Sequence, residues 1–396
     1  RVQKRGISGS DNIKVVCRFR PQNKMEKKQK GKVSVEFDTE NPQIAKVQAN
    51  QFDDSTHSFS FDRVYDMSST QEQVYETVGK PVVDAVLEGY NGTVFAYGQT
   101  SSGKTYTMEG PDHEPGLVPR MVSALFDCIA AAPQGIEYSV TVSMIEIYLE
   151  RVNDLLDVTR SNLQIREDTD RGIWVDGAKV EKLSQPGEIL EVMKTGQRNR
   201  STASTKMNNY SSRSHSLFIL TVHQRDLTSL RTQCGKLFLV DLAGSEKIRK
   251  TGATGARLEE AKMINKSLST LGNVINALTE PGVSHIPYRD SKLTRVLQES
   301  LGGNSKTALV ICCSPSSFNI SETVSTMRFG ARAKLIKNQA KINEEFSASE
   351  LQILLEKAQI EISTLKTKMR ESFKAAAKGN PDIIGQQVVQ ELETRL

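Results

Sequence analysis

The chain has 396 residues, of which 37% are hydrophobic and 25% are charged, the composition of a soluble globular protein. Its 52 Lys and Arg residues against 47 Asp and Glu leave a net charge of +5, too small to require nucleic acid as a partner. No stretch approaches the ~18 apolar residues of a membrane span, and the charged N-terminus lacks the apolar segment of a secretory signal. The five cysteines show no zinc or disulfide spacing, which favours a reducing cytoplasm.

After a polar N-terminal arm, short apolar stretches alternate with helical patterns as far as residue 335. Several stretches are almost entirely apolar, which predicts an α/β fold whose sheet is covered by helices on both faces. A capping-box pattern at 69–72 predicts a helix that ends near Gly89. Strands are predicted at 13–19, 33–37, 93–97, 138–147, 216–222, 236–240 and 307–312.

The sequence GQTSSGKT at 98–105 matches the P-loop pattern and directly follows a predicted strand. Its glycines let backbone N–H groups wrap phosphates, Lys104 would neutralise β/γ oxygens, and the Thr105 hydroxyl would ligate Mg²⁺. A nucleotide site is therefore predicted here. Its phosphate-binding residues are Gly98, Gln99, Thr100, Ser101, Ser102, Gly103, Lys104 and Thr105.

Two further segments contain groups suited to a phosphate site. The sequence DLAG at 241–244 follows a predicted strand, where Asp241 would lie near the metal and Gly244 would offer an N–H to the γ-phosphate. The hydroxyl-rich sequence NNYSSRSHS at 208–216 could coordinate Mg²⁺ and hold water. Alone, each would be an ordinary turn or loop. No guanine-reading Asn-Lys-x-Asp sequence occurs, which favours ATP over GTP.

Apolar residues near the C-terminus recur at alternating spacings of four and three. This pattern predicts a helix that pairs with a second copy in a coiled coil. It also fits an amphipathic helix packed on its own domain, although a short polar connector separates it from the preceding residues. The apolar positions are Leu351, Leu355, Ala358, Ile362, Leu365 and Met369.

Four sequences, CRFRP at 17–21, GQTSSGKT, NNYSSRSHS and DLAGSE, resemble the nucleotide motifs of the kinesin motor domain in order and spacing. The sequence HIPYRDSKLTRVLQESLGGN at 285–304 is similar to that family's microtubule-binding loop and the helix after it. Within the family, the C-terminal segments are most similar to conventional kinesin heavy chain, of the fungal type.

The resemblance implies a three-layer P-loop NTPase fold, with a central, mostly eight-stranded mixed sheet, helices on both faces and a C-terminal helix. It divides the chain into an N-terminal arm or cover strand at 1–11 and a motor domain at 12–335. A neck linker follows at 336–347, and a neck helix that starts a coiled coil occupies 348–396. Ile336, Asn338 and Asn343 match the neck linker that docks on the motor in the ATP state.

The resemblance also implies nucleotide contacts residue by residue. Arg18 and Pro21 would flank the adenine on one side, and Tyr106 would cover the other, where many relatives have His. The implied metal ligands are Thr105, Ser212 and, through water, Asp241.

The implied catalytic residues act on the γ-phosphate. Ser211 would position the attacking water, Gly244 would contact the γ-phosphate, and Arg213 would pair with Glu246 to close the two loops. Such a site suits phosphoryl transfer, which needs positioned water and charge stabilisation more than a strong base.

Apolar residues recur at helical spacing over 258–278, which predicts an amphipathic helix. Its polar face and the loop before it are basic, and that loop leads directly out of 241–246, so the γ-phosphate state could move this surface. A solvated basic face is the simpler alternative. Local basicity on a nearly neutral protein suits an acidic protein partner, and the resemblance implies tubulin. The predicted microtubule contacts are Lys247, Lys262, Lys266, Arg289, Lys292 and Arg295.

The implied function is a microtubule-stimulated ATPase that moves toward microtubule plus ends and transports cargo in the cytoplasm, on the cytoskeleton. It would use ATP and Mg²⁺ and form a homodimer through its C-terminal coil, without membrane or nucleic acid. A GTPase-like switch is disfavoured by the missing guanine reader, and a nucleic-acid motor by the lack of a binding module. A depolymerase or minus-end motor is disfavoured because the neck follows the motor.

Overall fold

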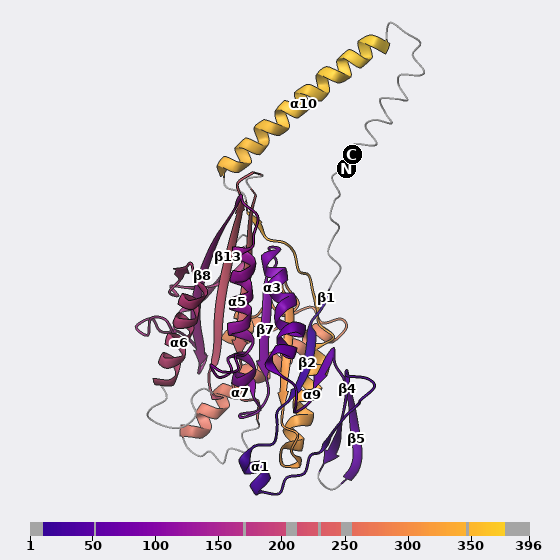
Figure 1. Ribbon diagram of the computed structural model, residues 1–396, viewed down its shortest axis with the longest axis vertical. Coiled ribbons are helices and arrows are strands. Elements are labelled where there is room, and N and C mark those ends of the chain that lie inside the picture. Colours follow the sequence, from indigo (N-terminus) through magenta and orange to yellow (C-terminus); the bar gives the residue numbers. More distant parts are fainter. Residues whose placement is uncertain are drawn as a thin grey trace.

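The computed structural model describes residues 11–50, 53–168, 172–202, 212–228, 231–246, 256–345 and 348–376 (Figure 1). Its centre is a mixed sheet in which eight strands follow one another in the order β12-β8-β13-β14-β7-β15-β2-β6. The strands are β12 (Glu181–Leu183), β8 (Ile136–Tyr148), β13 (His215–Asp226), β14 (Thr232–Asp241), β7 (Gly92–Tyr97), β15 (Lys306–Cys313), β2 (Lys14–Phe19) and β6 (Arg63–Tyr65). Two more strands, β9 (Arg151–Asp154) and β17 (Glu344–Glu345), pair with β8 and β14.

The sheet changes from antiparallel to parallel at β14. Strands β12, β8, β13 and β14 pair antiparallel, whereas β14, β7, β15, β2 and β6 pair parallel. The carboxyl ends of the central parallel strands therefore meet at one edge of the sheet, where α/β proteins bind ligands.

Two apolar cores lie on opposite faces of the sheet. Alternating residues of β2 show the division: Val15 and Cys17 belong to one core and Val16 to the other. The first core contains α7 (Ala256–Thr279), α8 (Lys292–Val296) and α9 (Ile320–Ala333). The second contains α3 (Lys80–Leu87), α5 (Leu117–Ala130) and α6 (Pro186–Thr202). This arrangement confirms the predicted three-layer fold with helices on both faces.

All seven predicted strands are present, but several half-polar strands were not predicted. The predicted strand β3 (Val35–Phe37) forms a small separate sheet with β4 (Ile44–Asn50) and β5 (Asp53–Ser60). The strands that were not predicted, β4, β5 and the hairpin of β10 (Gln164–Asp168) and β11 (Gly172–Asp176), lie outside the central sheet. Their sequences mix charged and apolar residues, so they lack the apolar stretches that marked the buried strands.

The predicted capping box is one residue too early. Thr70 Oγ1 accepts a hydrogen bond from Gln73 N at 3.3 Å, and Gln73 Oε1 accepts one from Thr70 N at 3.1 Å. The Ser69 hydroxyl donates to Asp66 Oδ1 instead, which removes it from the helix end. The helix runs from α2 (Gln71–Val74) through a π-helical turn at Tyr75–Gly79 into α3, and Gly89 follows with φ = 90°.

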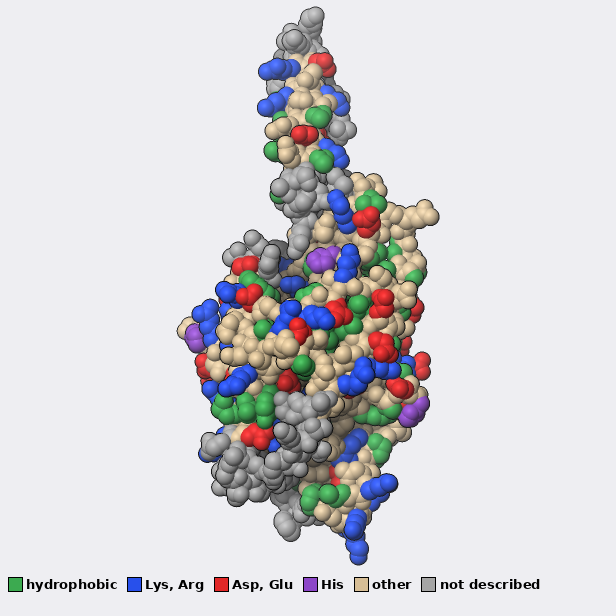
Figure 2. Space-filling model, turned by 90° about the vertical axis from the view of Figure 1, so that its left-hand side faces the viewer, with side chains coloured by type: hydrophobic (Ala, Val, Ile, Leu, Met, Phe, Trp, Pro, Cys, Tyr) green, Lys and Arg blue, Asp and Glu red, His purple; other side chains and the backbone are tan. Residues whose placement is uncertain are grey.

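The segment that leads into α10 (Ala348–Ala376) pairs with two other parts of the chain. Strand β1 (Asp11–Asn12) pairs antiparallel with β16 (Lys337–Asn338), and β17 pairs with the start of β14. Helix α10 then projects away from the sheet (Figure 1), and apolar side chains alternate with charged ones along it (Figure 2). Leu351 and Leu355 are 54% and 59% exposed, so α10 is not the self-packed amphipathic helix that the sequence left open.

Within the described ranges, no helix combines the length and the apolar character that crossing a membrane requires.

Candidate functional site

The P-loop connects the carboxyl end of β7 to α4 (Lys104–Met108). Its conformation depends on glycine, because a Cβ at Gly98 would lie 2.2 Å from Cys312 O and Gly103 has φ = 101°. Lys104 Nζ donates to Gly98 O at 2.9 Å and to Gln99 O at 3.0 Å. Burial lowers the pKa of Lys104, and a phosphate beside it would favour its charged form.

Two adjoining hollows lie beside this loop. The base-side hollow, of about 540 Å³, lies between the β2 end and α4 and includes Pro21 and Tyr106. The phosphate-side hollow, of about 360 Å³, is lined by the P-loop and by Ser212. Arg20, Gly103 and Tyr106 line both hollows, so together the two hollows could hold a base and a chain of phosphates.

A layer of polar contacts supports the base-side hollow. The guanidinium of Arg18 is buried, lies 5.2 Å from the centre of the Tyr106 ring, and donates to Gln71 Oε1 at 2.6 Å. Tyr106 Oη donates to Glu114 Oε2 at 2.7 Å. Arg18 therefore supports the Tyr106 wall directly, whereas the sequence placed the two residues on opposite sides of the base.

Asp241, at the carboxyl end of β14, lies beside the P-loop. Its Oδ2 accepts from Thr105 Oγ1 at 2.9 Å and forms an ion pair with Arg200 at 3.3 Å. Its Oδ1 is buried and has no hydrogen-bond partner among the described residues. A buried carboxylate oxygen without a partner fits the predicted metal, because a metal-bound water could donate to it.

Sequence reasoning missed Arg200. This residue is 4% exposed, lies on α6 and also donates from Nη2 to Ser214 O at 2.8 Å. Its only sequence signal is a basic residue shortly before the serine-rich segment, which is too common to distinguish it from a solvated arginine.

The predicted pair of Arg213 and Glu246 is not formed. Arg213 Nη1 lies 2.9 Å from Glu260 Oε2 on α7, and the oxygens of Glu246 accept from Thr100 N at 2.7 Å and Thr100 Oγ1 at 2.5 Å. Each charge is thus satisfied by a different neighbour. Ser211, the predicted water-positioning residue, lies outside the described residues.

The two loops nevertheless touch through the backbone. Gly244 N donates to Ser212 O at 2.8 Å, so this N–H is engaged within the protein rather than directed at a phosphate. A Cβ at Gly244 would lie 2.4 Å from both Glu246 Oε2 and Thr100 Oγ1, so a larger residue here would have to displace the side chains of Glu246 and Thr100.

His215 links the phosphate side of the site to α7, a contact that the sequence did not reveal. Its Nδ1 accepts from Ala243 N at 3.0 Å, and its Nε2 lies 2.7 Å from Ser267 Oγ. Burial, together with the positive charges of Arg200 and Lys104, lowers the pKa of His215 to about 3. The ring is therefore neutral at physiological pH, and since Nδ1 accepts, Nε2 carries the proton that reaches Ser267.

Helix α7 covers the sheet with one face and exposes the other. Leu271 and Ile275 are buried, while Lys262 and Lys266 are exposed, as the sequence predicted. On the one face of the molecule that Figure 2 draws, basic side chains are interspersed with acidic ones. Lys247 lies outside the described residues.

The basic residues near α8 differ from one another. The Arg289 side chain is 80% exposed, whereas that of Arg295 is 14% exposed and binds Glu167 Oε2 of β10 at 2.5 Å. Arg295 therefore fastens the β10–β11 hairpin to α8 and is less available to a partner than the sequence suggested. Glu150 fixes α8 itself by accepting from Ser291 Oγ and Lys292 N.

The loop after β7 is a phosphate-binding loop whose shape depends on glycine, and it lies beside Asp241 at the end of the adjacent parallel strand β14. Together these two features define a P-loop nucleotide-binding protein. Residues 18–336 match the family model described as the kinesin motor domain, and the chain belongs to that family.

Similar proteins include kinesins from amoebae, fungi and animals. The chain is 55% identical over 366 residues to Kinesin-related protein 3 of Dictyostelium discoideum, covering 91% of this chain and 30% of that protein. It is 53% identical over 362 residues to the Kinesin heavy chain of Botryotinia fuckeliana, covering 90% of this chain and 41% of that protein. The Kinesin-1 heavy chain of Rattus norvegicus is 49% identical over 90% of this chain and 36% of its own length.

These values confirm the resemblance to kinesin heavy chain, but the animal protein matches almost as well as the fungal one. The chain spans less than half the length of these relatives. A solved structure described as that of a fast kinesin, with implications for its ATPase mechanism and microtubule interactions, superposes with a TM-score of 0.80. It is 53% identical, with coverage of 86% of this chain and 96% of that one.

Proposed function

We propose that this chain is the motor portion of a microtubule-stimulated ATPase, which couples ATP hydrolysis to plus-end-directed movement and cargo transport. One observation carries the proposal: the predicted phosphate site and the predicted microtubule helix are joined by the hydrogen bonds from Ala243 through His215 to Ser267. A change in the loop at 241–246 can therefore reach α7 without crossing the core.

ATP and Mg²⁺ fit the residues that line the two hollows. Lys104 would exchange its two carbonyl partners for phosphate oxygens, and Tyr106 would cover the base. Thr105 and Ser212 would hold the metal, with Asp241 acting through water. When bound, Mg²⁺ would neutralise charge on the phosphate oxygens.

In the proposed cycle, Arg213 and Glu246 exchange their present partners when the two loops close. Closure would require Arg213 to leave Glu260 and Glu246 to leave Thr100, after which the two charges could pair. Since Glu260 lies on α7, the exchange would change the anchoring of the microtubule helix. Ser211 and Gly244 would act on water and γ-phosphate in the closed arrangement.

The linker at 336–347 would report the state of the site to the neck helix at 348–396. Asn338 Nδ2 donates to Ser305 O at 2.7 Å, and Asn343 Nδ2 donates to Cys234 O at 2.8 Å. Ile336 is 1% exposed. These contacts support a docked linker, with the arm at 1–11 acting as its cover strand.

Microtubules would contact the exposed basic residues of α7 and the segment that follows it. The exposed seam of α10 would form the homodimer, and the protein would act on the cytoskeleton in the cytoplasm. The proposed microtubule contacts are Lys247, Lys262, Lys266, Arg289 and Lys292, with Arg295 in a supporting role.

Gliding of polarity-marked microtubules over the immobilised chain tests activity and direction together. We expect ATP-dependent gliding with the minus ends leading, and none with Lys104→Ala, which removes the charge that meets the phosphates. Microtubule binding that does not depend on the nucleotide, without gliding, would instead support a binding protein.

A further inference from the structure

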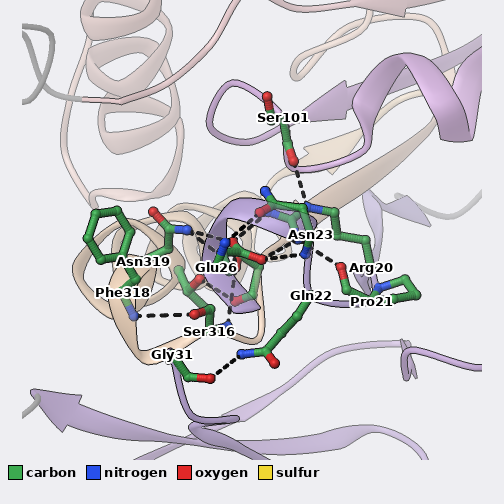
Figure 3. A network of polar contacts seen from close by, with 12 residues as sticks. Arg20, Pro21, Gln22, Asn23, Glu26, Gly31, Ser101, Ser316, Phe318 and Asn319 are labelled. Atoms are coloured by element: carbon green, nitrogen blue, oxygen red, sulfur yellow. Dashed lines mark hydrogen bonds and ion pairs between the residues drawn. The ribbon is translucent and has the colours of Figure 1, made fainter. Parts of the chain in front are cut away.

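Helix α1 (Lys24–Lys28) buries a single carboxylate in an otherwise solvated segment. The side chain of Glu26 is 3% exposed, although its neighbour Met25 is 66% exposed. The two oxygens of Glu26 accept five hydrogen bonds, shown in Figure 3. The donors are Arg20 Nη1 at 2.7 Å, Arg20 Nη2 at 2.7 Å, Asn23 N at 2.8 Å, Ser314 Oγ at 2.7 Å and Asn319 Nδ2 at 2.7 Å.

Arg20 extends this cluster to the nucleotide site. Its Nε donates to Ser101 O at 2.6 Å, and its two terminal nitrogens hold Glu26 in a bidentate ion pair. Ser101 has φ = 62°, a conformation that residues other than glycine rarely adopt without support from their surroundings. Arg20 also lines both hollows, where the base side meets the phosphate side.

Glu26 stays ionised across the working pH range. Burial alone would raise the pKa of Glu26, but the hydrogen bonds from Arg20, Ser314 and Asn23 outweigh it and lower that pKa to about 2. A fully satisfied bidentate pair fixes orientation more tightly than a single hydrogen bond does. Compared with apolar packing, a buried ion pair adds little net stability, so its contribution here is geometric.

We propose that Glu26 is a positioning residue for the nucleotide, acting through Arg20 to hold the P-loop at Ser101 and the junction of the two hollows in binding geometry. This inference rests on the proposed ATPase function and deepens it. Ser314 and Asn319 belong to the segment between β15 and α9. The carboxylate therefore joins the P-loop to the beginning of the helix whose other end leads into the linker.

Glu26→Gln tests the proposal, because it keeps the size of the side chain but places an amide against the guanidinium. Glu36→Gln is the matched control, since Glu36 is exposed on β3 near the same end of the chain. We expect the ATP KM and the Kd for a fluorescent ADP analogue to rise about tenfold in Glu26→Gln, a change of ~1.4 kcal/mol. The kcat at saturating ATP and microtubules should stay within about twofold of the wild-type value. The variant would bind the ground state and the transition state less tightly to the same extent, which raises KM without lowering kcat. Glu36→Gln should match the wild type.

A double variant tests the path through Arg20. Arg20→Lys keeps the positive charge but loses the bidentate geometry, and it should raise KM in the same way. Glu26→Gln combined with Arg20→Lys should be no worse than the more affected single variant, because the two residues act as one unit. Simple addition of the two effects would overturn the proposal.

The outcomes separate this inference from the proposed function. If the wild type neither binds nor hydrolyses ATP, the proposed function fails. If the wild type is active and Glu26→Gln keeps its ATP KM, or loses kcat with KM unchanged, only the inference fails. If Glu26→Gln does not fold, Arg20→Lys replaces it, and an unchanged KM in that variant overturns the inference.

Discussion

Helices α7 and α10 each carry one apolar stripe on an otherwise polar helix, yet only the stripe of α7 is covered. Leu271 and Ile275 are 0% and 1% exposed, whereas Leu355 and Ile362 are 59% and 51% exposed. The first stripe packs on the sheet of its own chain, while the second follows a linker and has no described surface to pack against. A periodic pattern therefore predicts a helix, and its place in the chain decides what covers it.

The largest difference should appear in stability. Leu271→Ala removes a buried side chain and should lower the free energy of unfolding by about 2–5 kcal/mol. Leu355→Ala, the same change on α10, should stay within about 0.5 kcal/mol for the motor portion. Urea unfolding measures the free-energy loss in both variants. It should be followed with a spectroscopic signal from the part of the chain that contains the nucleotide site. Equal losses would mean that α10 packs on the motor after all.

The second prediction concerns association. Leu355→Asp combined with Ile362→Asp should abolish the dimer in sedimentation equilibrium, because two charges enter a seam that is only about three heptads long and therefore marginal. Ser363→Asp with Thr364→Asp, outside that seam, is the control. The ATPase rate per chain without microtubules should not change. A dimer that survives the seam variant would place the contact elsewhere.

The third prediction concerns Ser267 on the buried face of α7. The described part of α10 has no comparable buried face. Ser267→Ala removes the partner of His215 Nε2 and should reduce microtubule stimulation of the ATPase about fivefold, the effect of ~1 kcal/mol. Basal turnover should stay near that of the wild type. Ser269→Ala, exposed on the same helix, is the control. Full stimulation in Ser267→Ala would show that the loop and α7 communicate by another route.

The smallest effects should come from the outer face of α7 and its neighbours. Lys266→Ala and Arg289→Ala should each weaken microtubule binding by about 0.2–1 kcal/mol, and rising salt should weaken binding steeply in the wild type. Lys357→Ala on α10 should change neither property. Variants that match the wild type at several salt concentrations would remove this face from the proposed interface.

Sequence reasoning found the features that depend on local chemistry. The P-loop, the Asp241 strand end and both amphipathic helices were recognisable, because glycine spacing and apolar periodicity act over a few residues. It missed Arg200, His215 and Glu26, whose roles come from contacts between residues distant along the chain, such as Glu26 and Asn319. It also placed Arg213 with Glu246, since a sequence cannot show which of two available partners a charge takes in one conformation.

The linker contacts have a mechanical consequence. From Ile336 to Glu345 the chain is held by three contacts in sequence order. Strand β16 pairs with β1, Asn343 bonds to β14, and β17 pairs with β14. A force that pulls α10 away from the sheet reaches β17 first and Ile336 last, because the chain transmits it in that order. These contacts would then break one after another. At any moment only a single contact would resist the force. A lateral force on α10 should therefore detach residues 336–345 in several steps. Each step should need less force than breaking all of these contacts at once in shear.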